Sequence, residues 1–348
     1  MELNLPKALV DFSPWASHSS PIWTLAHYTL RRNLDHYPFP QHLSVTERTI
    51  ISDVLKDALL KCASDKPLHL PLSKLSPLDK SFLTEQLFWN DNLQTLSDEA
   101  RVYMPPSFAW QALINGNDHL TLQCSSSQAD WTHCYRLLYD LESALSRNLN
   151  FGFSQQFGYL TSKFPTCGTG FTVQIYLHLP LLIHSQKLDD LLLKLLPEGI
   201  SARSLNHSAK FVGDVVILYN PRSLGVAEGD LASRVTSLAQ AIEREEKTLR
   251  STLRNHPIPE WIDRITKAYG LLRHSYKLSN KEALSALSPL KLATDLGWLE
   301  GITDAKFNIL FFKMRRGHLQ FEPHPDDPTD TLRATLLKKA FAPTTLTI

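Results

Sequence analysis

The chain has 348 residues, of which 43% are hydrophobic and 20% are charged, so it can bury a substantial core and is expected to divide into two domains. A formal net charge of +1 gives no argument for a nucleic-acid or membrane partner, and because we find neither a signal peptide nor a run of about 18 apolar residues, we expect a cytoplasmic protein. Four cysteines at wide, irregular spacings argue against a zinc site and a disulfide framework.

Helices and strands are expected to mix along residues 1–255. Apolar residues recur at helical spacing in four segments. These are 46–62, 79–88, 130–149 and 181–196. The last is apolar on most sides, so we expect one long, well-buried helix there. Strands are predicted at 102–123 around the turn 115–118, at 171–177, at 199–205 and at 215–219.

The sequence His256-Pro257-Ile258-Pro259 breaks the helical pattern and marks the expected domain boundary. We therefore expect an α+β domain over residues 1–255 and a helical domain over residues 256–348. Helical spacing predicts a series of helices in the second domain. They span 261–272, 280–287, 289–297, 304–312 and 330–341.

The run GYLTSKFPTCGTGFTVQIYLHLP, residues 158–180, contains the most specific pattern in the chain. A short half-apolar segment, a tight turn at Gly168-Thr169-Gly170 and an alternating strand follow one another, and Leu179-Pro180 opens a helix. The backbone donors of such a turn can hold an anion. An ordinary structural turn is the alternative, since the run matches neither a P-loop nor a dinucleotide fingerprint.

This run resembles the active-site segment of the ATP:guanido phosphotransferases and is most similar to that of the bacterial protein-arginine kinases. The family pattern there is G-Y-L-T-S-C-P-T-N-x-G-T-G-L-R-A…H-L-P. Two further blocks match in the correct order. The matching residues are 158–162, 168–170 and 178–180 in this run, 32–34, 39 and 40 near the start, and 115 and 118–120 between them. Matches continue from about Ile22 to Ala334, which identifies the chain as a member of this family.

The resemblance implies a phosphagen-kinase-like (glutamine-synthetase-like) α+β fold, in which helices flank an antiparallel sheet. It also implies a helical C-terminal domain for dimerisation and phosphoarginine sensing, and a place in a Clp-protease stress and quality-control pathway. The implied partners are a second copy of the chain, a zinc-bearing activator of the McsA type and a Clp-type unfoldase. The family's sensing motif R-D-x-x-R-A is partly retained here, as Asp330 and Arg333.

Most of the family's phosphate-binding arginines are replaced, and one is kept as Arg203. The replaced positions are His27, Thr29, Thr121 and Thr172. The reactive cysteine of the family falls on Lys163 or, in the other alignment frame, on Phe164. Its substrate-binding glutamates fall on Gly116 and Asn117.

The loop 204–210, which carries a further glutamate in the family, has no carboxylate. Phosphoryl transfer from ATP depends on positioning and on cations that neutralise the phosphates. A guanidinium, with a pKa above ~12, needs a carboxylate before it can act as a nucleophile. We therefore expect a cleft stripped of its guanidinium and carboxyl groups, in a weak or inactive pseudokinase that acts as a regulatory binding partner.

ATP with Mg is expected as a cofactor only if nucleotide binding survives, and no structural metal is expected. Two alternatives remain open. The first is an active protein-arginine kinase that uses relocated groups, namely Arg203 and Lys163 with His119 or Asp118. The second is an unrelated binding role on the same scaffold.

Four polar residues near these motifs have a structural interpretation. His27 is typical of a partly buried histidine in a hydrophobic strand. Arg31 and Arg32 are interpreted as structural ion-pair partners rather than phosphate ligands. In the family, the position of His119 supports a turn, as does that of its neighbour Asp118.

Overall fold

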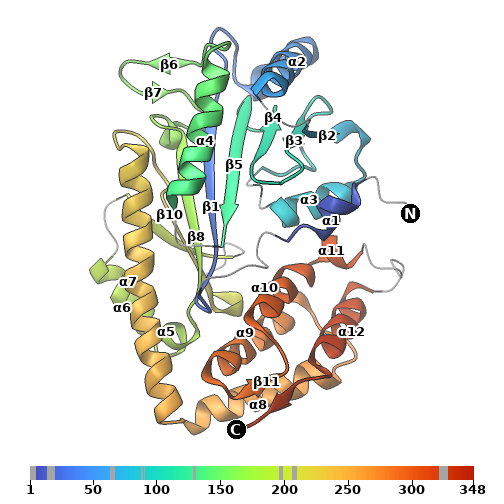
Figure 1. Ribbon diagram of the computed structural model, residues 1–348, viewed down its shortest axis with the longest axis vertical. Coiled ribbons are helices and arrows are strands. Elements are labelled where there is room, and N and C mark those ends of the chain that lie inside the picture. Colours follow the sequence, from blue (N-terminus) through green and yellow to red (C-terminus); the bar gives the residue numbers. More distant parts are fainter. Residues whose placement is uncertain are drawn as a thin grey trace.

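The computed structural model describes residues 5–13, 20–62, 67–87, 89, 91–127, 131–195, 199–205, 210–320 and 328–348. Strands and helices mix in the first part of the chain, and the last part is almost entirely helical (Figure 1). Within these ranges, no helix combines the length and the apolar character needed to cross a membrane.

One antiparallel sheet of eight strands forms the centre of the molecule. Its strands are β1 (Trp23–Arg32), β2 (Leu68–Pro71), β3 (Arg101–Met104), β4 (Gln111–Ile114), β5 (Leu120–Ser126), β8 (Phe171–His178), β9 (Ser201–Ser204) and β10 (Val215–Tyr219). Their order is β2-β3-β4-β5-β1-β8-β10-β9, and each neighbouring pair is antiparallel. This sheet with its flanking helices confirms the expected fold class.

Seven helices belong to the part of the described chain before residue 256. They are α1 (Lys7–Asp11), α2 (Val45–Cys62), α3 (Pro77–Leu87), α4 (Trp131–Ser146), α5 (Pro180–His184), α6 (Leu188–Leu195) and α7 (Glu228–Asn255). A small hairpin joins β6 (Phe153–Ser154) to β7 (Gly158–Tyr159). Figure 1 shows α4 and the long α7 lying across one face of the sheet.

The C-terminal helices lie together below the sheet in Figure 1. They are α8 (Pro259–His274), α9 (Asn280–Leu296), α10 (Asp304–Lys313), α11 (Arg316–Leu319) and α12 (Thr329–Phe341). Two short strands, β11 (Leu299–Glu300) and β12 (Thr345–Leu346), pair beside them.

Two helix predictions are wrong. The single buried helix expected over 181–196 is two short helices, because Gln186 adopts a left-handed backbone with φ 59° between α5 and α6. Helix α6 is also partly exposed, and Leu193 is 84% accessible. Conversely, the helices expected over 280–287 and 289–297 are one helix, α9, which contains Pro289 and is capped by the Ser279–Glu282 capping box.

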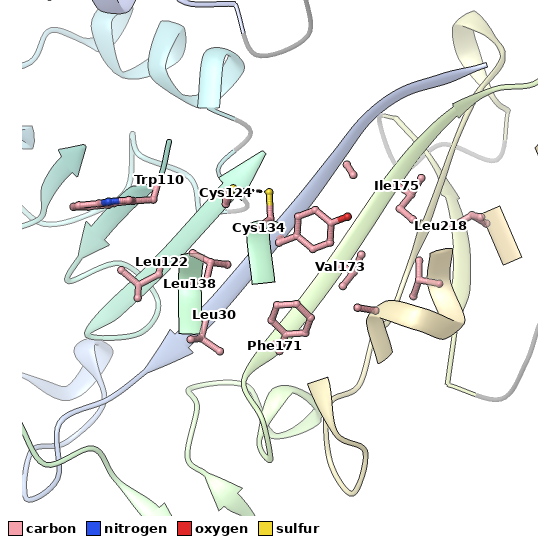
Figure 2. Packing of buried hydrophobic residues seen from close by; sticks show 14 of the residues in the cluster. Leu30, Trp110, Leu122, Cys124, Cys134, Leu138, Phe171, Val173, Ile175 and Leu218 are labelled. Carbon is pink, nitrogen blue, oxygen red and sulfur yellow. Dashed lines mark hydrogen bonds between the residues drawn. The ribbon is translucent and has the colours of Figure 1, made fainter. Parts of the chain in front are cut away.

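Alternate residues of the central strands face opposite sides of the sheet. On one side, Leu30, Leu122 and Val173 pack with Leu138 of α4 in the main hydrophobic core (Figure 2). In the same core, Cys124 Sγ of β5 lies 2.6 Å from Cys134 Sγ of α4, and both are free cysteines. This apolar side holds α4 and α7 against the sheet.

The opposite side of the same strands is polar near β5, β1 and β8. The register places Arg31 beside Thr121, and Thr29 between Gln123 and Thr172. Residues paired in this way share one face, so these side chains form one polar surface. We call it the polar face.

Further along the strands the polar face becomes apolar, and there it packs against the C-terminal helices. Leu25, Tyr176 and Ile217 belong to the core cluster that includes α8, α9 and α10. Helix α11 also contacts α3: Glu85 Oε1 accepts a hydrogen bond from the Gly317 N–H at 3.1 Å, and Glu85 Oε2 lies 3.1 Å from His318 Nδ1. The C-terminal helices therefore touch both the sheet and the helix that leads to residues 89–93.

Candidate functional site

A cavity of about 280 Å³ opens on the polar face beside the turn between β4 and β5. Five charged side chains line it. They are Arg31, Asp91, Asp118, Lys163 and Arg203. Uncharged polar side chains line it as well, among them Asn117, Thr172 and Gln174. The cleft is therefore not stripped of guanidinium and carboxyl groups, and that part of the sequence-based expectation is wrong.

The strand order separates these charges along the cavity. Asp118 lies at the β4–β5 turn, Arg31 on the adjacent β1, and Arg203 on β9 at the edge of the sheet. Neighbouring strands lie ~4.8 Å apart, so Asp118 and Arg203 approach the cavity from opposite sides. The cavity thus has an acidic side at β5 and a basic side at β9, with Arg31 between them.

Asp118 joins three parts of the chain around the acidic side. Its Oδ1 accepts hydrogen bonds from Asn33 Nδ2 and from the Ser162 N–H, both at 2.7 Å. Its Oδ2 lies 3.8 Å from Arg31 Nε. These contacts fix the glycine-bearing segment and the end of β1 to the turn, so Asp118 supports the site as well as lining it.

The two neighbouring arginines of β1 have different surroundings. Arg32 faces the core side, where its Nε lies 3.0 Å from Glu142 Oε1 and its guanidinium stacks 3.6 Å from the centre of the Tyr159 ring. The expected structural ion pair is confirmed for Arg32. Arg31 also has an ion pair, with Asp118, but it lines the cavity and donates from Nη1 to Thr172 Oγ1 at 3.1 Å. The sequence did not indicate that Arg31 lies at the cavity.

Asp91 is a site residue that the sequence analysis missed. It follows α3, is only 6% exposed and lines the cavity. Asn117 donates its side-chain amide to Asp91 Oδ1. Burial raises the pKa of Asp91, while the positive charge of Arg31 opposes that shift. No sequence pattern pointed to Asp91, because it lies outside every motif and reaches the site only through the fold.

The remaining cations, Lys163 and Arg203, differ in how far they are engaged. Arg203 donates from Nη2 to Gln174 Oε1 at 2.9 Å and lies 5.3 Å from the centre of the Tyr219 ring. Lys163 is exposed, and it forms no ion pair with any side chain that the structure describes. Lys163 is thus the least constrained positive charge at the cavity.

Three of the predicted nucleotide-binding positions, His27, Thr29 and Thr121, are buried and do not line the cavity. His27 Nδ1 lies 2.9 Å from Ser125 Oγ, and Nε2 lies 3.2 Å from Gln123 Oε1. Burial lowers the pKa of His27 to about 4, so the imidazole is neutral at physiological pH. His27 is fully buried rather than partly buried.

The hydroxyls of Thr29 and Thr121 have no hydrogen-bond partner among the described residues. The end of α3 contacts this part of the polar face, because Gln123 Nε2 donates to the carbonyl oxygen of Leu87, the last residue of the helix, at 2.8 Å. We call the buried residues His27, Thr29 and Thr121 the sealed end of the polar face, and we call the cavity beside them its open end.

The structure therefore divides the predicted site residues into two groups. Asn117, Lys163, Thr172 and Arg203 meet around the cavity. His27, Thr29 and Thr121 lie at the sealed end. Of the loop 204–210, residues 206–209 lie outside the described part of the chain.

His119 is a structural residue. Its Nδ1 accepts a hydrogen bond from the Leu34 N–H at 3.0 Å, and its Nε2 lies 2.9 Å from the Pro38 carbonyl oxygen, to which it donates. Burial lowers the pKa of His119, which keeps the ring neutral. Both ring nitrogens are occupied by the backbone, so the supporting role expected from the resemblance is the one observed.

In the C-terminal domain, Arg333 is buried and its guanidinium is engaged. It donates to the Met314 carbonyl oxygen at 2.9 Å, to the Leu278 carbonyl oxygen at 2.7 Å and to Asp330 Oδ1 at 2.6 Å. These bonds tie the start of α12 to two preceding segments. Phosphoarginine sensing by Asp330 and Arg333 stays a prediction. Across the described ranges, no cluster of three or more His, Cys, Asp or Glu side chains is arranged to hold a metal ion.

The chain matches known families over most of its length. Residues 50–249 match the sequence model described as "ATP:guanido phosphotransferase, C-terminal catalytic domain". Residues 260–346 match the one described as "Protein-arginine kinase McsB C-terminal domain". The chain is 30% identical over 331 residues to a protein-arginine kinase from Chlamydia pneumoniae, with 92% of each chain covered. It is 29% identical over 296 residues to one from Syntrophomonas wolfei, covering 84% of this chain and 82% of that one.

Two solved structures show the same fold. A duplicated taurocyamine kinase from Schistosoma mansoni, with bound transition-state-analogue components, superposes with a TM-score of 0.60 at 20% identity, over 76% of this chain and 38% of its own. A lombricine kinase superposes with a TM-score of 0.58 at 17% identity, over 71% of this chain and 72% of its own. The fold is therefore that of the phosphagen kinases.

Proposed function

The chain belongs to the ATP:guanido phosphotransferase family, in its protein-arginine kinase branch, and from this premise we propose that it is a weak or inactive kinase that acts as a regulatory binding protein. One observation carries the proposal. Where the family places phosphate-binding arginines, this chain has His27, Thr29 and Thr121, which are neutral, buried and outside the cavity.

The residues that remain do not fit a triphosphate with its Mg ion. Phosphoryl transfer needs several preorganised cations around the phosphates. Of the three cations at the cavity, Arg31 already contacts Asp118 and Thr172, and Arg203 already donates to Gln174. Lys163 alone does not replace a clamp of arginines, because each lost donor costs roughly 10²–10³ in rate.

A binding role is supported by the surface beside the cavity. Phe164, next to the cavity-lining Lys163, is 62% exposed. Exposed aromatic side chains are typical of contact residues in protein interfaces. The proposed partners are a second copy of this chain, a zinc-bearing activator of the McsA type and a Clp-type unfoldase, within the cytoplasmic Clp stress pathway that the family resemblance implies.

The test is a phosphoarginine assay on an arginine-rich protein substrate with ATP and Mg. A relative named protein-arginine kinase serves as the positive control, and ³¹P NMR of the intact phosphorylated protein gives the readout. We expect at least about a thousandfold less phosphoarginine than in the control, the scale of a few lost donors. Turnover at the rate of the control would refute the proposal.

The second candidate is an active protein-arginine kinase with relocated groups. The observation that favours it is the presence of Arg31, Lys163 and Arg203 in one cavity with Asp91 and Asp118. In this function, a carboxylate would orient the acceptor guanidinium and the cations would neutralise the phosphates. The same assay separates the candidates, because only this one predicts phosphoarginine.

A further inference from the structure

Two free cysteines meet in the main hydrophobic core, one from a strand and one from a helix. Cys124 lies on β5 and Cys134 on α4, and their Sγ atoms are 2.6 Å apart. Figure 2 shows the two side chains pointing toward one another. Both are buried, with exposed fractions of 3% and 1%. The pair lies on the apolar side of the sheet, so it takes no part in the cavity on the polar face.

This contact follows from the regular spacing of a strand and of a helix. In β5, Cys124 is two residues after Leu122, and both belong to the core on one side of the sheet. In α4, Cys134 is four residues before Leu138, and both lie on the buried face of that helix. The two sulfur atoms therefore meet because two regular elements pack together.

The pair is better suited to a disulfide than to a metal ion. Among the residues that the structure describes, no further His, Cys, Asp or Glu side chain completes a group of three that could hold a metal. A disulfide needs only two sulfur atoms, whose side chains must already face one another. Cys124 and Cys134 meet that condition across the boundary between α4 and the sheet.

The surroundings of the pair limit which oxidant can react with it. The hydrogen bond from Cys124 to Cys134 raises the pKa of the Cys124 thiol, and burial raises it further. Oxidation begins from a thiolate, so the reaction should be slow at neutral pH. The oxidant must also be small, because neither side chain is more than 3% exposed. Hydrogen peroxide and other small peroxides meet this requirement.

We propose that Cys124 and Cys134 form a modification site, at which a peroxide converts the two thiols into a disulfide that joins α4 to β5. One sulfur attacks a peroxide oxygen, the O–O bond breaks, and a sulfenic acid forms as the first water leaves. The other thiol attacks this sulfur, the S–S bond forms and a second water leaves. The two cysteines together lose two electrons, which the peroxide accepts.

The bond restrains a helix that supports the central strand. Helix α4 also carries Glu142, whose Oε1 lies 3.0 Å from Nε of the β1 residue Arg32. A covalent link between α4 and β5 reduces the freedom of the unfolded chain and so stabilises this layer. The inference goes beyond the proposed function, since it holds for an active and for an inactive kinase.

The experiment treats the reduced full-length protein with hydrogen peroxide and then alkylates it with N-ethylmaleimide in urea. The sequence contains four cysteines, so we expect two alkylated thiols after oxidation and four after dithiothreitol. An aspartate-directed protease cleaves before Asp130, between the two cysteines, and the disulfide should keep the two fragments together until it is reduced. The midpoint of thermal unfolding should rise by about 3–8 °C on oxidation.

Two variants separate this pair from the other thiols. In Cys134→Ala, peroxide should give no linked fragments and no rise in the thermal midpoint. The matched control is Cys62→Ala, which removes a cysteine from the end of α2 and should still form the bond. Thermal unfolding of the reduced proteins verifies that both variants are folded.

Three results would overturn the inference. The first is a peroxide-treated wild type that keeps four alkylatable thiols. The second is a disulfide that maps to Cys62 or Cys167 instead of the proposed pair. The third is an unchanged thermal midpoint in protein that carries the Cys124–Cys134 bond, because the bond would then not stabilise the contact between α4 and β5.

Discussion

The open and sealed ends of one polar face differ sharply, although the same strands form both. At the open end, Arg31 and Asp118 lie at a cavity with Asp91 and Lys163. At the sealed end, buried neutral groups replace the charges, and His27 has a pKa of about 4. One strand, β1, contributes to both ends within a few residues.

The difference shows that the buried part of this surface favours uncharged side chains. A charge buried at the sealed end would lose its hydration without a partner, which is expensive. Hydroxyl groups and a neutral imidazole cost far less there, even where Thr29 and Thr121 lack hydrogen-bond partners. In this account, the loss of the phosphate clamp and the closure of that end of the face are one change.

The largest expected effect is a difference in stability between variants of the two neighbouring arginines of β1. Arg32→Ala leaves Glu142 buried without its partner, so we expect a loss of about 3–5 kcal/mol in the free energy of unfolding. Arg31→Ala removes a pair at 3.8 Å beside a cavity and should cost about 1 kcal/mol. Urea denaturation measures both. Equal losses would mean that the two faces of β1 do not differ as described.

The sealed end can be tested by pH. The pKa of His27 is lowered from 6.5 to about 4 by burial, so the unfolded chain binds a proton first as the pH falls. Stability should therefore decrease between about pH 6.5 and pH 4, by on the order of 3 kcal/mol from this group. His27→Gln should lose that part of the pH dependence.

The comparison uses urea titrations of both proteins at pH 7, 5.5 and 4. Other histidines with lowered pKa values, such as His119 and His178, are present in both proteins and cancel in the difference. Exposed His42→Gln is the surface control. Parallel curves for wild type and His27→Gln would show that the imidazole is not held neutral by burial.

The C-terminal helices should help to hold α3, whose last residue contacts the sealed end of the polar face. A Cβ atom on Gly317 would lie 2.7 Å from Glu85 Oε2 and 2.9 Å from the Phe82 nitrogen. We expect Gly317→Ala to cost about 1–3 kcal/mol and to speed hydrogen exchange of the amides near Trp89. Gly270→Ala, at a helix position with no heavy atom within 4 Å, is the control. Unchanged hydrogen exchange near Trp89 would show that α11 does not stabilise the end of α3.

The smallest effect is expected at the unpartnered hydroxyls. Thr29→Val and Thr121→Val replace buried hydroxyls that make no hydrogen bond to a described residue, so stability should stay unchanged or rise by up to about 1 kcal/mol. A loss above that size in urea denaturation would show that these hydroxyls have partners and that the end is not sealed.

The sequence predicted the parts of the fold that depend on local periodicity. The strand over 215–219 agrees with β10, and the helix over 46–62 agrees with α2 within one residue at its start. The break at Gln186 was missed, because hydrophobic spacing carries no information on a single left-handed residue.

The site was predicted in part for a similar reason. Motif positions such as Asn117 and Lys163 do meet at the cavity. Asp91 and Arg31 were missed because their role depends on which side chains the folded chain brings together. The burial of Thr29 and Thr121 was also missed, since burial depends on how the folded chain packs.

The most direct test of the central claim is a calorimetric titration of the wild-type protein with ATP and Mg. If the arginine clamp has been replaced by buried, neutral side chains, no binding should be measurable up to millimolar nucleotide. Micromolar affinity for ATP, lost in Lys163→Ala and Arg203→Ala, would contradict the account and favour an active kinase with relocated groups.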